Sequence, residues 1–131
     1  MALGNARQTH LQVVHTIRAP FGYADPALTA GKRVGAIPKN CRVLSAVLVV
    51  ETAFNAGTTN PISAGITALG TDFFNAAAGQ TVAINAATLT VPMSTVASSA
   101  DQDIYVSYVP TGTAATTGQA TLVVTYVPDQ A

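Results

Sequence analysis

Few residues in this chain could do covalent or metal chemistry, and the first candidates are two histidines and one cysteine. His10 and His15 are five residues apart. In an extended strand, this odd spacing puts the two rings on opposite faces, so they cannot readily hold one metal ion. Cys41 is a potential nucleophile, but no catalytic motif surrounds it and both histidines are distant in sequence. We therefore expect exposed strand histidines and a small buried cysteine at the start of a strand.

Two further patterns could bind a cation or a phosphate. Asp101 and Asp103 would share a strand face, where two carboxylates could hold calcium or act as acid and base. The simpler interpretation is a solvated beginning of a strand. Gly31-Lys32 looks like the end of a phosphate-binding loop, but position 26 is proline where the motif requires glycine. Arg33 also follows where the motif has Ser or Thr, so we exclude this loop.

The aromatic residues could form a platform for a sugar or a nucleotide base. Only 6% of the residues are aromatic, and tryptophan is absent. Packing in the core and at interfaces is the simpler interpretation of five of them: Phe73, Phe74, Tyr105, Tyr108 and Tyr126. The sequence thus offers no catalytic, cofactor-binding or metal-binding residues, and we expect neither an enzyme nor a cofactor.

The composition excludes several partners. Charged residues make up 9% of the 131 residues, against about 25% in ordinary soluble domains. The formal net charge is zero, so no excess of cations exists to follow a nucleic-acid backbone. Residues 1–17 contain arginine, glutamine and histidine where a signal peptide is apolar, and no apolar run reaches the roughly 18 residues of a membrane-spanning helix. We expect no direct contact with nucleic acid or membrane, and synthesis in the cytoplasm.

The charges are unevenly placed along the chain. All basic residues precede position 43, and every acidic residue except Asp25 follows it. Such asymmetry is compatible with head-to-tail contact between copies or docking on an acidic surface, but a fold that interleaves early and late strands would mix the charges again. The candidate contact residues are Arg7, Arg18, Lys32, Arg33, Lys39 and Arg42.

The elements that must position these residues are mostly short strands. Residues 42–52 are dense in valine and leucine on both faces, which is typical of a covered central strand. Glycine and proline within 21–36 indicate a loop with room for one short strand, and Asp72 can cap a short helix through Ala78. Further strands are expected at 8–17, which Pro20 closes, and at 62–69, 81–84, 88–93, 104–109 and 120–127.

About six to eight short strands and at most one short helix predict an all-β fold, an antiparallel β-sandwich, and leave open whether it is a jelly roll. We expect residues 1–131 to form a single domain. Its terminal arms, about 1–7 and 129–131, would become ordered on binding. Alanine and threonine stand where lysine and glutamate are usual, which is typical of surfaces that rest against a neighbour.

Four segments are distinctive: VGAIPKNCRVL at 34–44 with the strand that follows it, TAFNAGTTN at 52–60, TDFFNAAA at 71–78, and TGTAATTGQATLVVTYVP at 111–128. They resemble small virion proteins of tailed bacteriophages, in particular capsid decoration or cement proteins. The resemblance covers roughly residues 34–128 and rests on strand and turn patterns.

This resemblance implies a β-sandwich or jelly roll bound in many copies to the outside of an icosahedral capsid. The protein would be made in the host cytoplasm and end on the virion surface, where it would stabilise the shell by bridging capsid subunits. The implied partners are the major capsid protein and further copies of this chain, as a dimer or trimer. No catalytic residue is implied, and the basic residues named above would guide the protein toward an acidic capsid face.

A second interpretation retains the β-sandwich fold but places the protein in the tail or a fibre of the virion. A tail- or fibre-associated module that binds a receptor or a carbohydrate would share this strand pattern but display exposed aromatic residues and occur in few copies. The absence of tryptophan argues against it.

Overall fold

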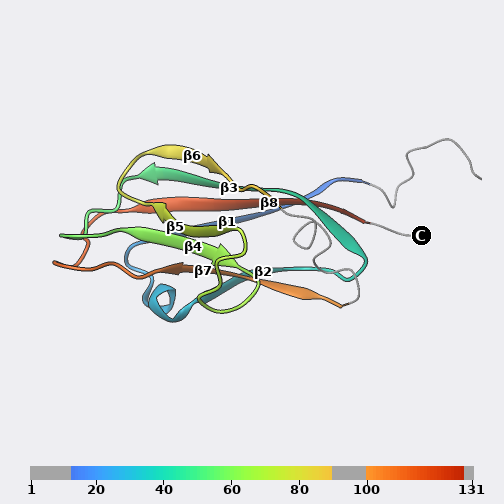
Figure 1. Ribbon diagram of the computed structural model, residues 1–131, viewed down its shortest axis with the longest axis horizontal. Helices are drawn as coiled ribbons and strands as arrows, with labels where there is room; N and C mark the ends of the chain where they lie inside the picture. Colours follow the sequence, from blue (N-terminus) through green and yellow to red (C-terminus); the bar gives the residue numbers. More distant parts are fainter. Residues whose placement is uncertain (1–12, 90–99, 129–131) are drawn as a thin grey trace, which may run out of the picture.

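Two antiparallel four-stranded sheets form the structure, a computed structural model that describes residues 13–89 and 100–128. The strands run along the long axis of the molecule in two layers (Figure 1). This arrangement confirms the predicted all-β antiparallel sandwich with at most one short helix.

Strands equally distant from the two ends of the chain are neighbours. Sheet A has the order β1-β8-β3-β6, made of His15–Gly22, Gln119–Pro128, Cys41–Thr52 and Ala83–Ala86. Sheet B has the order β2-β7-β4-β5, made of Lys32–Ile37, Gln102–Tyr108, Pro61–Gly65 and Phe74–Ala78. The pairing is therefore nested: first strand with last, second with seventh, third with sixth, and fourth with fifth.

The alternation of side chains along β3 and β8 builds one wall of the core. Leu48 faces Leu122 across the pair, and both side chains point between the sheets and are buried. From sheet B, Ile62, Ile104 and Val106 fill the same space. Each such aliphatic side chain contributes about 1.5–3 kcal/mol when fully buried. The core therefore depends on strands drawn from both halves of the sequence.

The first strand differs from its prediction. β1 begins at His15 and continues past Pro20, which pairs with Thr121 in register. Proline was expected to end the strand, but β1 is an edge strand, where a residue without an N–H group is tolerated on the side that has no neighbour. The predicted start at residues 8–12 lies outside the described residues.

The helix predicted from Asp72 to Ala78 is wrong. These residues lead into β5, which pairs with β4, and Phe74 is buried in the core. The Asp72 carboxylate accepts a hydrogen bond from the Ile66 N–H group at 3.0 Å, so it closes the β4–β5 connection and does not cap a helix. Tertiary pairing and burial here override the helical preference of alanine.

The helical turn lies elsewhere, within the segment predicted as a loop with one short strand. It is the 3-10 helix η2, Pro26–Ala30, and the Asp25 side chain caps it by accepting from the Ala27 N–H group at 3.3 Å. β2 follows as the short strand. Among the residues that the structure describes, no helix has the length and apolar character needed to cross a membrane.

The remaining strands match their predictions within a few residues. β3, β7 and β8 each contain the predicted span almost entirely, and β8 runs through Pro128, which pairs with Cys41. β4 is shorter than the predicted 62–69, and β6 is displaced toward the C-terminus from 81–84. Most of the strand predicted at 88–93 lies outside the described residues, and the described positions 88 and 89 are not in a strand.

Two uncharged loops meet at the end of the sandwich where β3 and β7 end. Asn60 is 7% exposed, and its side-chain oxygen accepts hydrogen bonds from the Tyr108 hydroxyl at 2.7 Å and the Ala56 N–H group at 2.8 Å. Its amide nitrogen donates to the Ala56 carbonyl oxygen at 3.2 Å. In the same way, the Asn55 side-chain oxygen accepts from the N–H groups of Thr116 and Thr117. These side chains lock the β3–β4 loop to β7 and to the β7–β8 loop.

Gly118 supplies the first test of this fold. Its φ is +145°, and a Cβ atom added there would lie 2.3 Å from Cδ2 of the buried Phe54 ring. We expect Gly118→Ala to lower the free energy of unfolding by roughly 3 kcal/mol, measured by denaturant unfolding. Gly22→Ala is the control, because its Cβ would meet the far end of the Gln119 side chain at 3.0 Å, which can turn away, and the Gly118 carbonyl oxygen at 3.3 Å, which is a much milder contact than 2.3 Å from a buried ring. Equal losses in the two variants would contradict this packing.

Asn60 supplies the second test. Asn60→Ala leaves the Tyr108 hydroxyl and the Ala56 N–H group buried without an acceptor, and we expect a loss of about 2–4 kcal/mol in unfolding free energy. Tyr108→Phe removes only the hydroxyl and leaves the Ala56 bonds intact, so its loss is expected near 1 kcal/mol. A Tyr108→Phe loss as large as that of Asn60→Ala would show that the asparagine does not organise the loop.

Candidate functional site

The structure brings His15 and Cys41 to one cavity although they are far apart in sequence. The cavity of about 260 Å³ lies where β1 and β3 begin and β8 ends, and its lining is His15, Pro38, Lys39, Asn40, Cys41, Tyr126 and Pro128. No sequence pattern predicted that these two residues would lie close together. Their proximity follows from the pairing of β8 with both β1 and β3.

These two residues are not arranged as a nucleophile and its base. The His15 ring stacks on Tyr126, with ring centroids 5.5 Å apart. Cys41 is buried at the start of β3, as predicted, and its thiol donates to the Lys39 carbonyl oxygen at 3.8 Å. Burial raises the pKa of the Cys41 thiol, and the nearby Asp101 carboxylate raises this pKa further. A thiol held in its protonated form is a poor nucleophile. His10 lies outside the described residues.

The two aspartates at the start of β7 do not form a carboxylate pair. Asp103 binds the Nε group of Arg33 at 2.8 Å, and this hydrogen bond, together with the negative charge, raises the pKa of the Arg33 guanidinium. Asp101 accepts from the Lys39 N–H group at 2.8 Å. Within 13–89 and 100–128, no group of three metal-ligating side chains comes together.

Lys32 is also engaged inside the chain. Its ammonium group forms an ion pair with the Asp25 carboxylate, and this hydrogen bond lowers the pKa of Asp25. Gly31, just before it, has a φ of +90° and passes close to the backbone of Leu69. The segment therefore anchors η2 and does not form a phosphate-binding loop.

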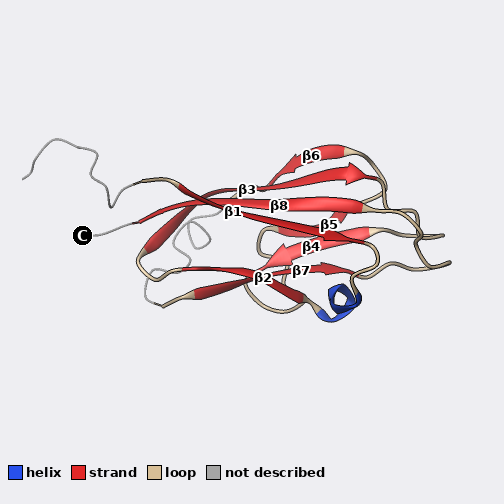
Figure 2. Cartoon of the chain, turned by 180° about the vertical axis from the view of Figure 1, so that it is seen from behind, coloured by secondary structure: helices blue, strands red, loops and turns tan. Residues whose placement is uncertain are grey.

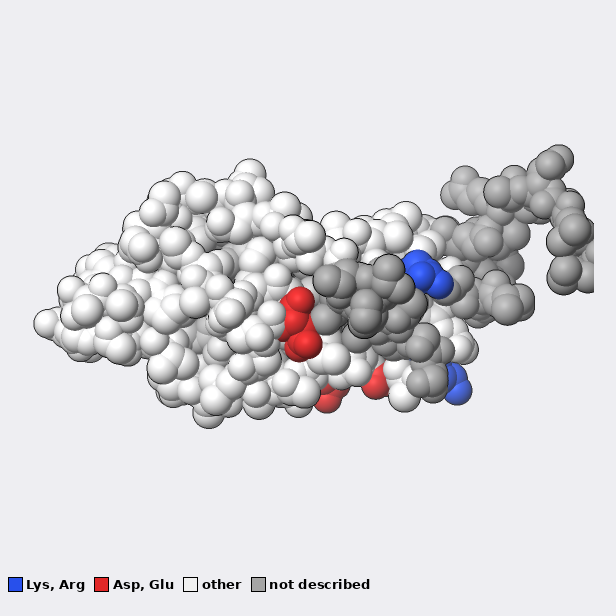
Figure 3. Space-filling model, viewed as in Figure 1, with Lys and Arg blue, Asp and Glu red and all other residues white. Residues whose placement is uncertain are grey.

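The candidate contact residues do not form a single patch. Arg18 on β1 and Arg42 on β3 both lie on the outward side of sheet A. Lys39 lies in the turn between β2 and β3, whereas Lys32 and Arg33 belong to β2 in sheet B. Arg7 is outside the described residues. On the face seen in Figure 3, separate basic groups lie toward one end, acidic groups lie nearer the middle, and the opposite half of that face shows no charge.

The aromatic residues belong mainly to the core. Phe73, Phe74 and Tyr108 are buried, and the Tyr108 ring lies 4.6 Å, centroid to centroid, from Phe54. Burial raises the pKa of the Tyr108 hydroxyl. Tyr105 and Tyr126 are half-buried. These positions do not make an open stacking platform.

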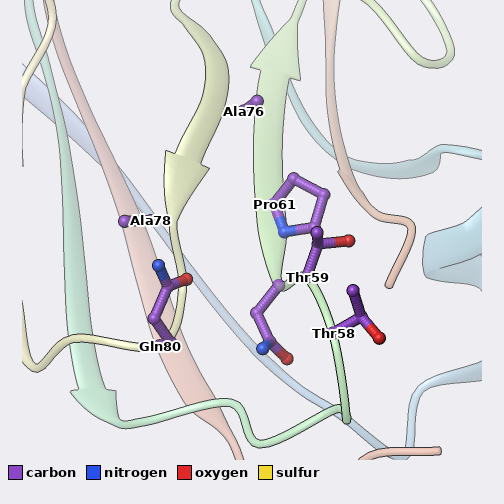
Figure 4. A pocket seen from close by; sticks show the side chains of 7 residues that line it. Thr58, Thr59, Pro61, Ala76, Ala78 and Gln80 are labelled. Carbon is purple, nitrogen blue, oxygen red and sulfur yellow. The ribbon is translucent and has the colours of Figure 1, made fainter. Parts of the chain in front are cut away.

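A second cavity of about 280 Å³ opens beside the start of β4 and the end of β5 (Figure 4). Its lining is uncharged: Thr58, Thr59, Asn60, Pro61, Ala76, Ala78 and Gln80. The Thr59 hydroxyl is bound to the Thr111 hydroxyl at 2.6 Å, and the polar atoms of Asn60 bind Tyr108 and Ala56. Without an aromatic ring or a free carboxylate, the cavity lacks the usual groups of a sugar site.

The outer faces of the two sheets differ. On sheet B, the 3-10 helix η2 lies against β7 (Figure 2), and the β4–β5 connection reaches Gly31 beside β2. Ser107, which alternation places on the outer side of β7, is 4% exposed. On sheet A, Ile84 of β6 is 75% exposed and Leu44 of β3 is 48% exposed. The chain thus covers one outer face and leaves apolar side chains open on the other.

No protein-family model matches the sequence, and no curated protein matches it. Solved structures of phage capsids, however, contain chains with the same fold. A chain in the capsid asymmetric unit of cyanophage Pam1 matches with a TM-score of 0.70 and 20% sequence identity, covering 97% of this chain and 93% of that one.

A chain in the capsid of Ralstonia phage GP4 matches with a TM-score of 0.67 and 16% identity, covering 98% of this chain and 94% of that one. In the acid-stable capsid of Helicobacter pylori bacteriophage KHP30, the TM-score is 0.67 and the identity 14%, with 90% of each chain covered. This chain therefore shares its fold, over nearly its whole length, with chains of three phage capsids.

Proposed function

We propose that this protein is a virion structural protein that binds the outside of an icosahedral phage capsid in many copies and stabilises the shell by bridging capsid subunits. The observation that carries this proposal is the likeness in fold to chains of three phage capsids. In each comparison at least 90% of both chains is covered, so the matching chains are about as long as this one. The proposed partners are the major capsid protein and further copies of this chain.

The strand topology supports a jelly-roll assignment within this proposal. Eight strands in two sheets, with first beside last and second beside seventh, are what results when a long hairpin of paired strands rolls into a sandwich. The fold exposes broad, regular sheet faces and uncharged loop ends, which suit contacts with a flat neighbour.

The physical mechanism is repetition of modest contacts. With few charges available, attachment comes mainly from apolar and backbone groups, and each copy would bury on the order of 1,000 Å² or more across a joint between subunits. Many copies on one shell convert such contacts into strong overall attachment. The shell then resists the pressure of the packaged genome.

The tail- or fibre-associated module is less well supported by the surface. Among the aromatic residues that the structure describes, Tyr23, at 42%, is the one clearly exposed side chain. The cavity beside β4 and β5 has no aromatic ring in its lining, in contrast to the usual carbohydrate site, whereas the cavity at His15 includes the Tyr126 ring.

The copy number in purified virions tests the proposal directly. We expect hundreds of copies in a fixed ratio to the major capsid protein, measured by quantitative mass spectrometry. Particles that lack the protein should release their genome at a lower temperature, and adding the purified chain should restore the original temperature. A handful of copies would favour a tail or fibre location. Failure of any shell to assemble without the chain would instead identify it as the shell-forming subunit.

The role of the basic residues has a matched test. Arg18 is exposed and has no ion-pair partner among the described residues, whereas Gln80 is exposed beside the second cavity. Arg18→Gln and Gln80→Glu each lower the net charge by one. We expect Arg18→Gln to weaken capsid binding about threefold at low salt and Gln80→Glu to leave it unchanged, measured by binding to capsids that lack the protein. Equal binding by the two variants would exclude Arg18 as a guide.

A further inference from the structure

The outer face of sheet A is apolar where an antiparallel sheet facing water is ordinarily polar. Val47 pairs with Val123 of β8 on one side and with Ala86 of β6 on the other. Two residues further along, Val49 lies between Thr121 and Ile84. Since paired residues point to the same side of a sheet, these side chains form continuous rows across β8, β3 and β6. We call this surface the sheet A face.

Among the residues that the structure describes, the charges on the sheet A face have mostly one sign. Arg18 pairs with Val123, so it extends the central row at the β1 edge, and Arg42 pairs with Val127. The carboxylate at this face, Glu51, accepts a hydrogen bond from the Thr121 hydroxyl at 2.6 Å. The face therefore presents aliphatic side chains with cations beside them.

This charge pattern bears on what covers the face. In a symmetric pair of copies the same patch occurs on both subunits, so two cationic faces would meet. A partner whose surface is apolar and bears carboxylates complements the face instead.

The size of the sheet A face also favours a capsid partner over a second copy of this chain. Four strands spaced about 4.8 Å apart, with about 3.3 Å per residue over some eight residues, make a face of roughly 500 Å². A stable pair of proteins usually buries about 800 Å² on each partner. A free dimer held by this face alone would be weak, whereas attachment repeated over a lattice gains from avidity.

We infer that the sheet A face is the surface by which this protein docks on the capsid shell, against an apolar, carboxylate-bearing surface of the shell protein. The inference rests on the proposed function and adds which side of the sandwich faces the capsid shell. The outer side of sheet B, covered by η2 and the β4–β5 connection, then faces away from the shell.

Aspartate substitutions at exposed aliphatic residues test this orientation. Ile84→Asp and Leu44→Asp place a carboxylate on the sheet A face, whereas Leu69→Asp makes the same change at a 52%-exposed leucine in the β4–β5 connection. Ile84→Ala removes apolar area without adding charge, and Ile84→Leu retains it. Circular dichroism and thermal unfolding establish that each variant is folded.

The readout is binding to capsids that lack the protein, together with light scattering of the free chain. We expect Ile84→Asp and Leu44→Asp to weaken binding at least tenfold, Ile84→Ala to weaken it less, and Ile84→Leu and Leu69→Asp to bind as the wild type does. Wild-type binding by Ile84→Asp, or equal losses in Leu69→Asp, would overturn the inference while leaving the proposed function intact. A change in oligomeric state confined to the sheet A variants would overturn it in favour of contact between copies. Failure of the wild type to bind would refute both proposals.

Discussion

The insertion of β8 between β1 and β3 is the constraint on which the rest of the structure depends. This strand, almost the last of the chain, supplies Leu122 and Val124 to the core and pairs on both sides along its length. Until β8 is in place, β1 has no hydrogen-bonding partner in sheet A, and β3 has no partner on the edge opposite β6. Contacts between such distant segments are entropically costly to form, so the fold gains its stability late and cooperatively.

The same nested pairing redistributes the charges. The first third of the chain is basic and the remainder acidic, yet β2 lies beside β7, and Arg33 and the Lys39 backbone meet Asp103 and Asp101 there. The Arg33–Asp103 ion pair thus joins a basic residue of the first third to an acidic residue of the remainder and offsets part of the charge asymmetry visible in the sequence. Arg18 and Arg42 lie instead on sheet A, where their register partners on β8 are valines.

The sequence predicted those parts of the fold that short-range pattern controls. β3, β7 and β8 alternate or are densely apolar, and their positions were correct. β5 was mistaken for a helix because its alanines favour a helix locally, while the burial of Phe74 and the pairing with β4 are tertiary effects. Pro20 was misread because only the structure shows that β1 is an edge. The meeting of His15 with Cys41, and the difference between the two outer faces, also depend on topology and could not be predicted.

The difference between the outer faces of the two sheets makes the two sides of the molecule unequal. A two-layer sandwich has two outer faces, and here η2 lies against β7 and β2 of one sheet while the other exposes Ile84 and Leu44 to water and leaves its valines partly exposed. Exposed apolar surface costs about 25 cal/mol per Å², and large patches of it mark contact sites or aggregation hazards. Because only 9% of the residues are charged, few charged side chains are available to offset this exposed apolar area. An apolar face beside cations is therefore best understood as a surface meant to be covered by a partner.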